Sequence, residues 1–227
     1  MIVLGLETAT PVCGVALGRG DSVLVERSLN VGTHHAERLL PMIRDALEEA
    51  GMGLRDIDGI AVSIGPGSFT GLRIGLSTAK SLCWSAGLPL VAVPTLEAMA
   101  AQFPHAACPV CPALDARKKE VYAALYDMSS GGPRTLIAPA AVLPVPFVSS
   151  LTGPTLFVGD GARLYRKEIV GILGEAARFA PPPLDRPSAA AVAALGLSRL
   201  GRGETEDLAR VEPVYLRKSE AELRHGR

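Results

Sequence analysis

The sequence predicts an α/β fold built from two similar subdomains with a cleft between them. Short apolar runs alternate along the chain with amphipathic stretches of helical period, a pattern typical of α/β proteins. The order of strands, hairpin, helix, strand and helix occurs in the first half and again, more loosely, in the second. The chain has 227 residues and 48% of them are hydrophobic, enough for a packed core in one domain or two small ones.

The first half begins with three short apolar runs separated by turn residues, which predict an antiparallel meander of strands. An amphipathic helix follows at about Ala36–Ala50. A buried strand at Ile57–Ile64 then passes through the sharp loop Gly65–Ser68 into a second helix, Phe69–Ala86, which ends at a glycine. The other expected elements of this half are Ile2–Leu6, Val12–Leu17, Val23–Val25, Leu88–Val93 and the short helix Leu96–Gln102.

The second half is expected to begin with a hairpin and to end with a helix that starts at the N-cap Ser188. A Pro- and Gly-rich stretch separates the hairpin from the later elements. The expected elements are Val110–Leu114, Val121–Tyr126, Thr155–Val158, Leu164–Leu173 and Ala189–Leu200, with Pro181–Pro183 as a rigid linker. The expected subdomains are residues 1–105 and 106–208, and residues 209–227 are expected to form a tail that packs back on the first.

Charge and hydropathy exclude several classes of protein. The chain has 23 Lys and Arg against 23 Asp and Glu, so no excess of positive charge is available to grip nucleic acid or an anionic membrane. Glu7 interrupts the N-terminal apolar run too early for a signal peptide. The longest uncharged run, between Arg134 and Asp160, contains four prolines that would break a spanning helix. We therefore expect a soluble, cytoplasmic protein.

The segment Gly65–Gly75 has the sequence GPGSFTGLRIG and lies between a strand and a helix, where a phosphate cradle would sit. It lacks the lysine of a Walker A loop and does not match G-x-G-x-x-G. Two interpretations remain open. The segment is either a tight turn in which Ser68 or Thr70 caps free amides, or it contacts a ligand directly.

Two helix faces are candidates for close packing. Gly71, Gly75 and Ala79 recur every four residues, so they lie on one face and would let another helix, from this chain or another, approach closely. On the first helix, Met42 and Ala46 lie off the expected buried stripe of Leu40, Ile43 and Leu47, and either intramolecular burial or a protein interface would explain them. The candidate partner-interface residues are Leu39, Met42, Ile43, Ala46, Gly71, Arg73, Gly75 and Ala79.

The first strand runs into Glu7-Thr8-Ala9-Thr10, where actin-like and sugar-kinase ATPases have an Asp-x-Gly-Thr/Ser phosphate loop. Glu7 replaces the acid and Ala9 replaces the glycine, and both changes weaken nucleotide chemistry. The second such loop is equally degenerate at Asp160. Asp115 lies in a charged turn that either is simply solvated or faces the cleft. The expected degenerate nucleotide cleft is Glu7, Thr8, Asp115 and Asp160, with no catalytic residue.

Metal ligands are not expected either. His34 and His35 are adjacent on a helix and point about 100° apart, so they cannot chelate one ion. Cys108 and Cys111 form a lone Cys-x-x-Cys, for which inert burial is favoured over a metal or redox role.

Five segments together resemble the bacterial TsaB (YeaZ) family, over most of the chain. They are Leu4–Thr10, Glu37–Pro41, Gly65–Arg73, Ala113–Lys118 and Val211–Arg217. The most specific is GPGSFTGLR at Gly65–Arg73. The resemblance implies an α/β, actin-like ATPase fold (ribonuclease H-like, ASKHA) with two similar subdomains.

The resemblance also implies partners. TsaB proteins pair with TsaD, a catalytic paralogue that transfers threonylcarbamoyl to adenosine 37 of tRNA, and the P-loop ATPase TsaE joins the pair. In the family, the helices that correspond to Ala36–Ala50 and Phe69–Ala86 form the TsaB–TsaD interface and a similar homodimer interface. TsaD has a metal-binding histidine pair on the first of these helices, a spacing that this sequence lacks.

The resemblance leads us to expect a non-catalytic scaffold and activator subunit of the tRNA N6-threonylcarbamoyladenosine (t6A37) modification complex. It would bind and stabilise TsaD, contact TsaE, pair with a second copy of itself and reach tRNA through the complex. No intrinsic cofactor is expected, and ATP or ADP and metal belong on partner subunits or at the complex interface. The alternatives are a stand-alone actin-like-fold ATPase or small-molecule kinase, and a dimerisation module outside tRNA biology.

Overall fold

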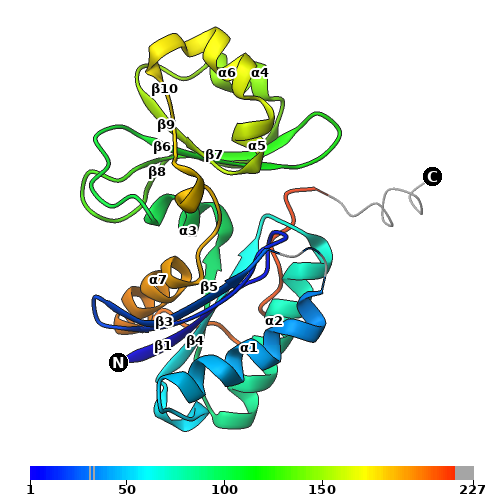
Figure 1. The fold of residues 1–227 in the computed structure, drawn as a ribbon, viewed down its shortest axis with the longest axis vertical. Coiled ribbons are helices and arrows are strands. Elements are labelled where there is room, and N and C mark those ends of the chain that lie inside the picture. Colours follow the sequence, from blue (N-terminus) through cyan, green and yellow to red (C-terminus); the bar gives the residue numbers. More distant parts are fainter. Residues whose placement is uncertain (31, 33, 218–227) are drawn as a thin grey trace, which may run out of the picture. The chain divides into compact units, whose positions relative to one another are not determined.

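The computed structural model describes residues 1–30, 32 and 34–217 (Figure 1). The chain divides into two compact units. The first unit contains Met1–Ala98 and Pro187–Val214, and the second contains Met99–Arg186 together with residues 215–217. These boundaries differ from the expected subdomains 1–105 and 106–208, because residues 99–105 belong to the second unit and residues 187–208 return to the first. The expected tail 209–227 is divided as well: residues 209–214 join the first unit and 215–217 the second, and residues 218–227 lie outside the described part of the chain.

The first unit has a five-stranded sheet in the order β3-β2-β1-β4-β5. The three N-terminal strands pair antiparallel, as the turn-separated apolar runs predicted, and β4 and β5 run parallel to β1. The strands are β1 (Ile2–Glu7), β2 (Cys13–Arg19), β3 (Ser22–Leu29), β4 (Gly59–Gly65) and β5 (Leu90–Pro94).

Helices cover both faces of this sheet (Figure 1). Helix α1 (His35–Glu49) and helix α2 (Phe69–Ala86) lie on one face, and α7 (Ala189–Gly201) lies on the other. The alternation of strand side chains explains this arrangement, because Leu4 and Leu6 join the core under α1 and α2 whereas Val3 joins the core under α7. The short α3 (Thr95–Ala101) follows β5.

The position of α7 corrects the expectation that this helix belongs to the second subdomain. The helix packs on β1, β2 and β4 through small residues. A Cβ atom at Gly5 would lie 2.4 Å from the carbonyl oxygen of Ala189, so only a glycine in β1 allows the helix to come this close. The Ser188 hydroxyl caps the helix as expected, accepting from the Ala191 N–H at 3.2 Å, and Arg199 forms an ion pair with Glu97.

The second unit repeats the topology of the first. Its sheet has the order β10-β9-β6-β7-β8, in which β6, β7 and β8 form the antiparallel meander and β9 and β10 are parallel to β6. The prediction of two similar subdomains is therefore confirmed. The strands are β6 (Val110–Asp115), β7 (Val121–Asp127), β8 (Arg134–Val142), β9 (Thr155–Val158) and β10 (Ala177–Phe179).

Three short helices complete this unit. They are α4 (Pro144–Ser149), α5 (Asp160–Leu164) and α6 (Arg166–Leu173). The single helix expected at Leu164–Leu173 is thus two helices, which meet at Tyr165. Single 3₁₀ turns occur at Leu54–Asp56, Gly174–Ala176 and Pro182–Leu184. Within the described part of the chain, every helix is too short or too polar to span a membrane.

Candidate functional site

The turn that follows β1 is the first candidate site. Residues Glu7 to Thr10 are buried, and the Glu7 side chain is fully inaccessible. The Glu7 carboxylate accepts a hydrogen bond from the Ala9 N–H at 2.6 Å and another from the Ser63 hydroxyl of β4. Burial raises the pKa of Glu7 to about 7, and the two hydrogen bonds offset only part of that effect.

The start of α2 packs directly on this turn. Ser68 donates its N–H to the Ala9 carbonyl at 2.6 Å, and the Thr8 hydroxyl donates to the Gly71 carbonyl at 2.8 Å. The Ser68 hydroxyl also accepts from the Gly71 N–H at 3.2 Å, so the structure shows the helix cap that was one of the two interpretations of Gly65–Gly75.

Glycines make this contact possible. A Cβ atom at Gly67 would lie 2.2 Å from the Ala9 carbonyl oxygen, and one at Gly71 would lie 2.1 Å from the Thr8 carbonyl oxygen. A Cβ atom at Gly75 would lie 2.2 Å from the Thr8 hydroxyl oxygen. The sequence prediction of close packing by Gly71 and Gly75 is correct, but the neighbour is a turn of the same chain rather than another helix.

His35, the first residue of α1, closes the other side of the turn. Its Nε2 lies 2.9 Å from the Thr10 carbonyl oxygen, and its Nδ1 has no hydrogen-bond partner in the described part of the chain. Burial lowers the pKa of His35, and the contact with Thr10 offsets part of that effect. His34 is exposed and lies 3.6 Å from Glu37.

The residues of the turn do not fit a nucleotide phosphate. A phosphate loop offers free backbone N–H groups and room for the anion. Here the N–H of Ala9 bonds to Glu7, the N–H of Val12 bonds to Thr10 at 3.3 Å, and the turn is covered by α2 and His35. Among residues 1–30, 32 and 34–217, no three His, Cys, Asp or Glu side chains gather as metal ligands.

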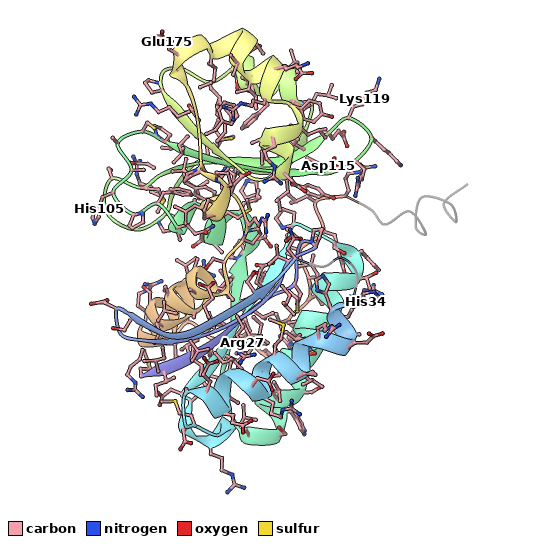
Figure 2. All side chains as sticks on the ribbon, viewed as in Figure 1. Arg27, His34, His105, Asp115, Lys119 and Glu175 are labelled. Atoms are coloured by element: carbon pink, nitrogen blue, oxygen red, sulfur yellow. The ribbon has the colours of Figure 1, made fainter. Side chains whose placement is uncertain are left out.

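In the second unit, Asp115 and Asp160 hold the end of β6. The Asp160 carboxylate accepts from the Asp115 N–H at 3.0 Å. Asp115, which is labelled in Figure 2, in turn accepts from the Arg117 N–H at 2.8 Å and pairs with the Arg117 guanidinium at 3.1 Å. The four cleft candidates therefore lie as two pairs, Glu7 with Thr8 in the first unit and Asp115 with Asp160 in the second, and all four make internal hydrogen bonds.

Cys108 and Cys111 differ in exposure, because Cys108 is half-buried and Cys111 is buried. Cys111 is buried in β6, and burial raises the pKa of its thiol. A raised pKa disfavours the thiolate that metal binding and redox exchange require.

The expected partner interface needs correction. Leu39, Met42, Ile43 and Ala46 form the core between α1 and the sheet, and Gly71, Gly75 and Ala79 are buried as well. The two apolar patches seen in α1 are one broad buried face, because the helix packs on both β2 and α2. Of the eight candidates only Arg73 is exposed, with its guanidinium 3.9 Å from the centre of the Phe69 ring.

Two large exposed residues on these helices were missed. Leu40 is 53% exposed and Trp84 is 82% exposed. The sequence pattern placed Leu40 in the buried stripe, but the spacing of Leu39, Met42, Ile43, Ala46 and Leu47 fits one helix face better and places Leu40 outside.

Comparisons with known proteins decide the family. The family model "TsaD: tRNA N6-adenosine threonylcarbamoyltransferase" matches residues 29–225. A Bacillus subtilis protein, "tRNA threonylcarbamoyladenosine biosynthesis protein TsaB", is 32% identical over 227 residues, covering 99% of this chain and 97% of the relative. The chain belongs to the TsaB (YeaZ) family.

Solved structures agree with the TsaB assignment. "YeaZ from Pseudomonas aeruginosa" superposes with a TM-score of 0.82 at 30% identity, covering 95% of this chain and 99% of the other. The ROK hexokinase from Thermus thermophilus, at 14% identity and a TM-score of 0.53, covers 87% of this chain and 100% of its own. The predicted actin-like ATPase (ASKHA) fold is therefore confirmed for this TsaB-family chain.

Proposed function

We propose that this chain is a non-catalytic scaffold and activator subunit in tRNA N6-threonylcarbamoyladenosine (t6A37) synthesis. It binds and stabilises a catalytic TsaD-type paralogue, with a TsaE-type P-loop ATPase as a third component. ATP or ADP and metal belong to these partners, and tRNA is modified by the complex. The proposal builds on the Bacillus subtilis relative named for this pathway, which is 32% identical over almost the whole chain.

One observation carries the non-catalytic part of the proposal. The turn that would contact phosphate in an ATPase is buried, and its acid, Glu7, bonds to Ala9 and Ser63. A carboxyl group with a pKa of about 7 in a site closed to solvent is poorly placed to hold Mg²⁺ or a water molecule. The chain therefore contributes through binding to its partners.

Reconstitution tests this proposal. Purified TsaD- and TsaE-type proteins, a TsaC-type enzyme that makes the threonylcarbamoyl-adenylate donor, and tRNA are incubated with and without this chain. Modified adenosine is measured by mass spectrometry. We expect modification to depend on the chain and to survive Glu7→Gln. Undiminished product without the chain would refute the scaffold role, and ATP turnover by the isolated chain that is lost in Glu7→Gln would favour an enzyme instead.

The partner-binding surface is proposed to be the outer face of α1 and α2, defined by Leu40, Arg44, Arg73, Ser77 and Trp84. All five are exposed, and they lie opposite the buried core residues of the two helices. Tryptophan and arginine contribute binding energy at interfaces more often than other residues do. A paralogue with the same fold presents a matching pair of helices, as does a second copy of this chain.

Leu40→Arg is expected to weaken the complex with the TsaD-type partner at least tenfold, because it places an unpaired charge in an apolar contact. The free energy of unfolding should change by less than about 0.5 kcal/mol, since Leu40 is half exposed. Calorimetric titration measures the first quantity and urea unfolding the second. The matched control is Leu164→Arg, at an exposed leucine of α5. Equal affinities for both variants and the wild type would exclude this face.

A further inference from the structure

The turn between β6 and β7 has an unusual backbone. Three consecutive residues, Arg117, Lys118 and Lys119, have φ values of 62°, 51° and 65°. Residues other than glycine adopt this left-handed backbone conformation at a cost of about 1–2 kcal/mol per residue. Such backbone strain persists only where the surrounding structure imposes it. No glycine occurs between Asp115 and Glu120 to relieve it.

Several contacts hold the turn in this conformation. The N–H of Ala116 bonds to the Glu120 carbonyl at 3.0 Å, and the N–H of Glu120 bonds to the Arg117 carbonyl at 3.0 Å. From the C-terminal segment, the Arg217 guanidinium donates to the Ala116 carbonyl at 2.9 Å and pairs with Glu120 at 3.2 Å. The contacts thus hold the turn at its first residue, Ala116, and at its last, Glu120, and we call it the clamped turn.

The charges of the turn are not balanced. Arg117 pairs with Asp115, and Glu120 pairs with Arg217. Lys118 and Lys119 are exposed, and within the described part of the chain neither lies within 4 Å of an acidic group. Figure 2 shows the Lys119 side chain pointing outward at the end of the hairpin. In a chain with no net charge, this rigid tip is a local concentration of unpaired positive charge.

We propose that Lys118 and Lys119, held by the clamped left-handed turn, bind the phosphodiester backbone of the tRNA. Phosphates are recognised by lysine as a point charge, without base-specific geometry. A rigid turn loses less conformational freedom on binding than a mobile loop would, which explains why strain is retained at a surface position. The inference rests on the proposed function and adds a direct RNA contact to it.

The test uses the assembled complex with its TsaD-type partner and full-length tRNA. Lys118→Gly, Lys119→Gly and the double variant remove charge while glycine keeps the left-handed turn without strain. Removing each lysine charge should weaken tRNA binding roughly 5- to 8-fold at 0.1 M salt and reduce the slope of log K against log[salt] by about 0.7–0.9. Lys167→Ala, at an exposed lysine of α6, is the control and should change neither quantity.

The outcomes separate this inference from the proposed function. Weaker tRNA binding by the turn variants, with partner affinity unchanged and modification restored at high tRNA concentration, supports the lysine–phosphate contact. Unchanged tRNA affinity and salt slope in an active complex overturn it and leave the scaffold role intact. An equal decrease in tRNA affinity with Lys167→Ala would also overturn it, because it would indicate a diffuse effect of positive charge. A decrease in partner affinity alone would overturn it as well, because it would indicate that the turn contacts a protein.

Discussion

Gly71→Ala is expected to destabilise the protein by about 3 kcal/mol or more, the largest effect that we predict for a single methyl group. Its Cβ atom would lie 2.1 Å from the Thr8 carbonyl oxygen and 3.3 Å from Cδ2 of His35. The first neighbour is backbone at the end of a central strand, so it cannot move aside cheaply. Separating the two would also break the hydrogen bond from the Thr8 hydroxyl to the Gly71 carbonyl.

The matched control is Gly171→Ala in α6. Gly171 is also a helical glycine, but no atom outside its own stretch of helix lies within 4 Å of its would-be Cβ. Alanine there should stabilise the protein by about 0.5–1 kcal/mol, because it favours helix and restricts the unfolded chain. Urea unfolding followed by far-UV circular dichroism measures both variants. If Gly71→Ala has wild-type stability but a weakened partner complex, the close contact of Gly71 is with the partner and not with the turn at Thr8.

The second large effect is a pH dependence of stability that originates at Glu7. Because its folded pKa of about 7 lies above the ordinary value of 4.5, the folded protein keeps a proton that the unfolded chain releases. The stability from this proton is complete below about pH 4.5 and is lost as the pH rises to about 7. This difference between the folded and unfolded pKa values of Glu7 corresponds to a change of about 3 kcal/mol in the free energy of unfolding.

Glu7→Gln removes this dependence while keeping a hydrogen-bonding side chain of the same size. We expect the stability of the variant relative to the wild type to rise by about 2.5 kcal/mol from pH 5 to pH 8. His35 acts in the opposite direction, because its lowered pKa costs stability as the pH falls, but it is present in both proteins and cancels. Glu168→Gln, at an exposed carboxylate of α6, should follow the wild type. Parallel pH profiles for Glu7→Gln and the wild type would mean that Glu7 is ionised throughout.

Local sequence patterns predicted most of the elements of both units. The meander at Ile2–Leu29 follows from apolar runs and turn residues, and the caps Ser68 and Ser188 lie where their hydroxyls were expected to act. The strand β8 was missed because Pro139 and several alanines give it no alternation, and it lies at the edge of its sheet, where proline is tolerated.

Long-range relations could not be predicted. Nothing local in Ala189–Gly201 says which sheet the helix covers, because an apolar helix with small residues fits either one. The spacing of Gly71 and Gly75 reports only that something approaches closely, so it could not distinguish a turn from another helix. The sequence neighbours of Glu7 indicate a weakened catalytic acid, whereas its hydrogen bond from Ser63 and the cover of its turn by Gly71 and His35 come from three other segments.

The return of α7 to the first unit sets the order in which the protein can fold during synthesis. One face of the first sheet carries Val3, Ala16 and Ala61, which are buried only when Val192 and Ala193 have been made. Roughly 90 residues separate the two parts of this unit, a delay of roughly 5–18 s at ribosomal rates of about 5–20 residues per second. During that interval an apolar sheet face is exposed on the nascent chain, so the first unit can be completed only after the chain of the second has been synthesised.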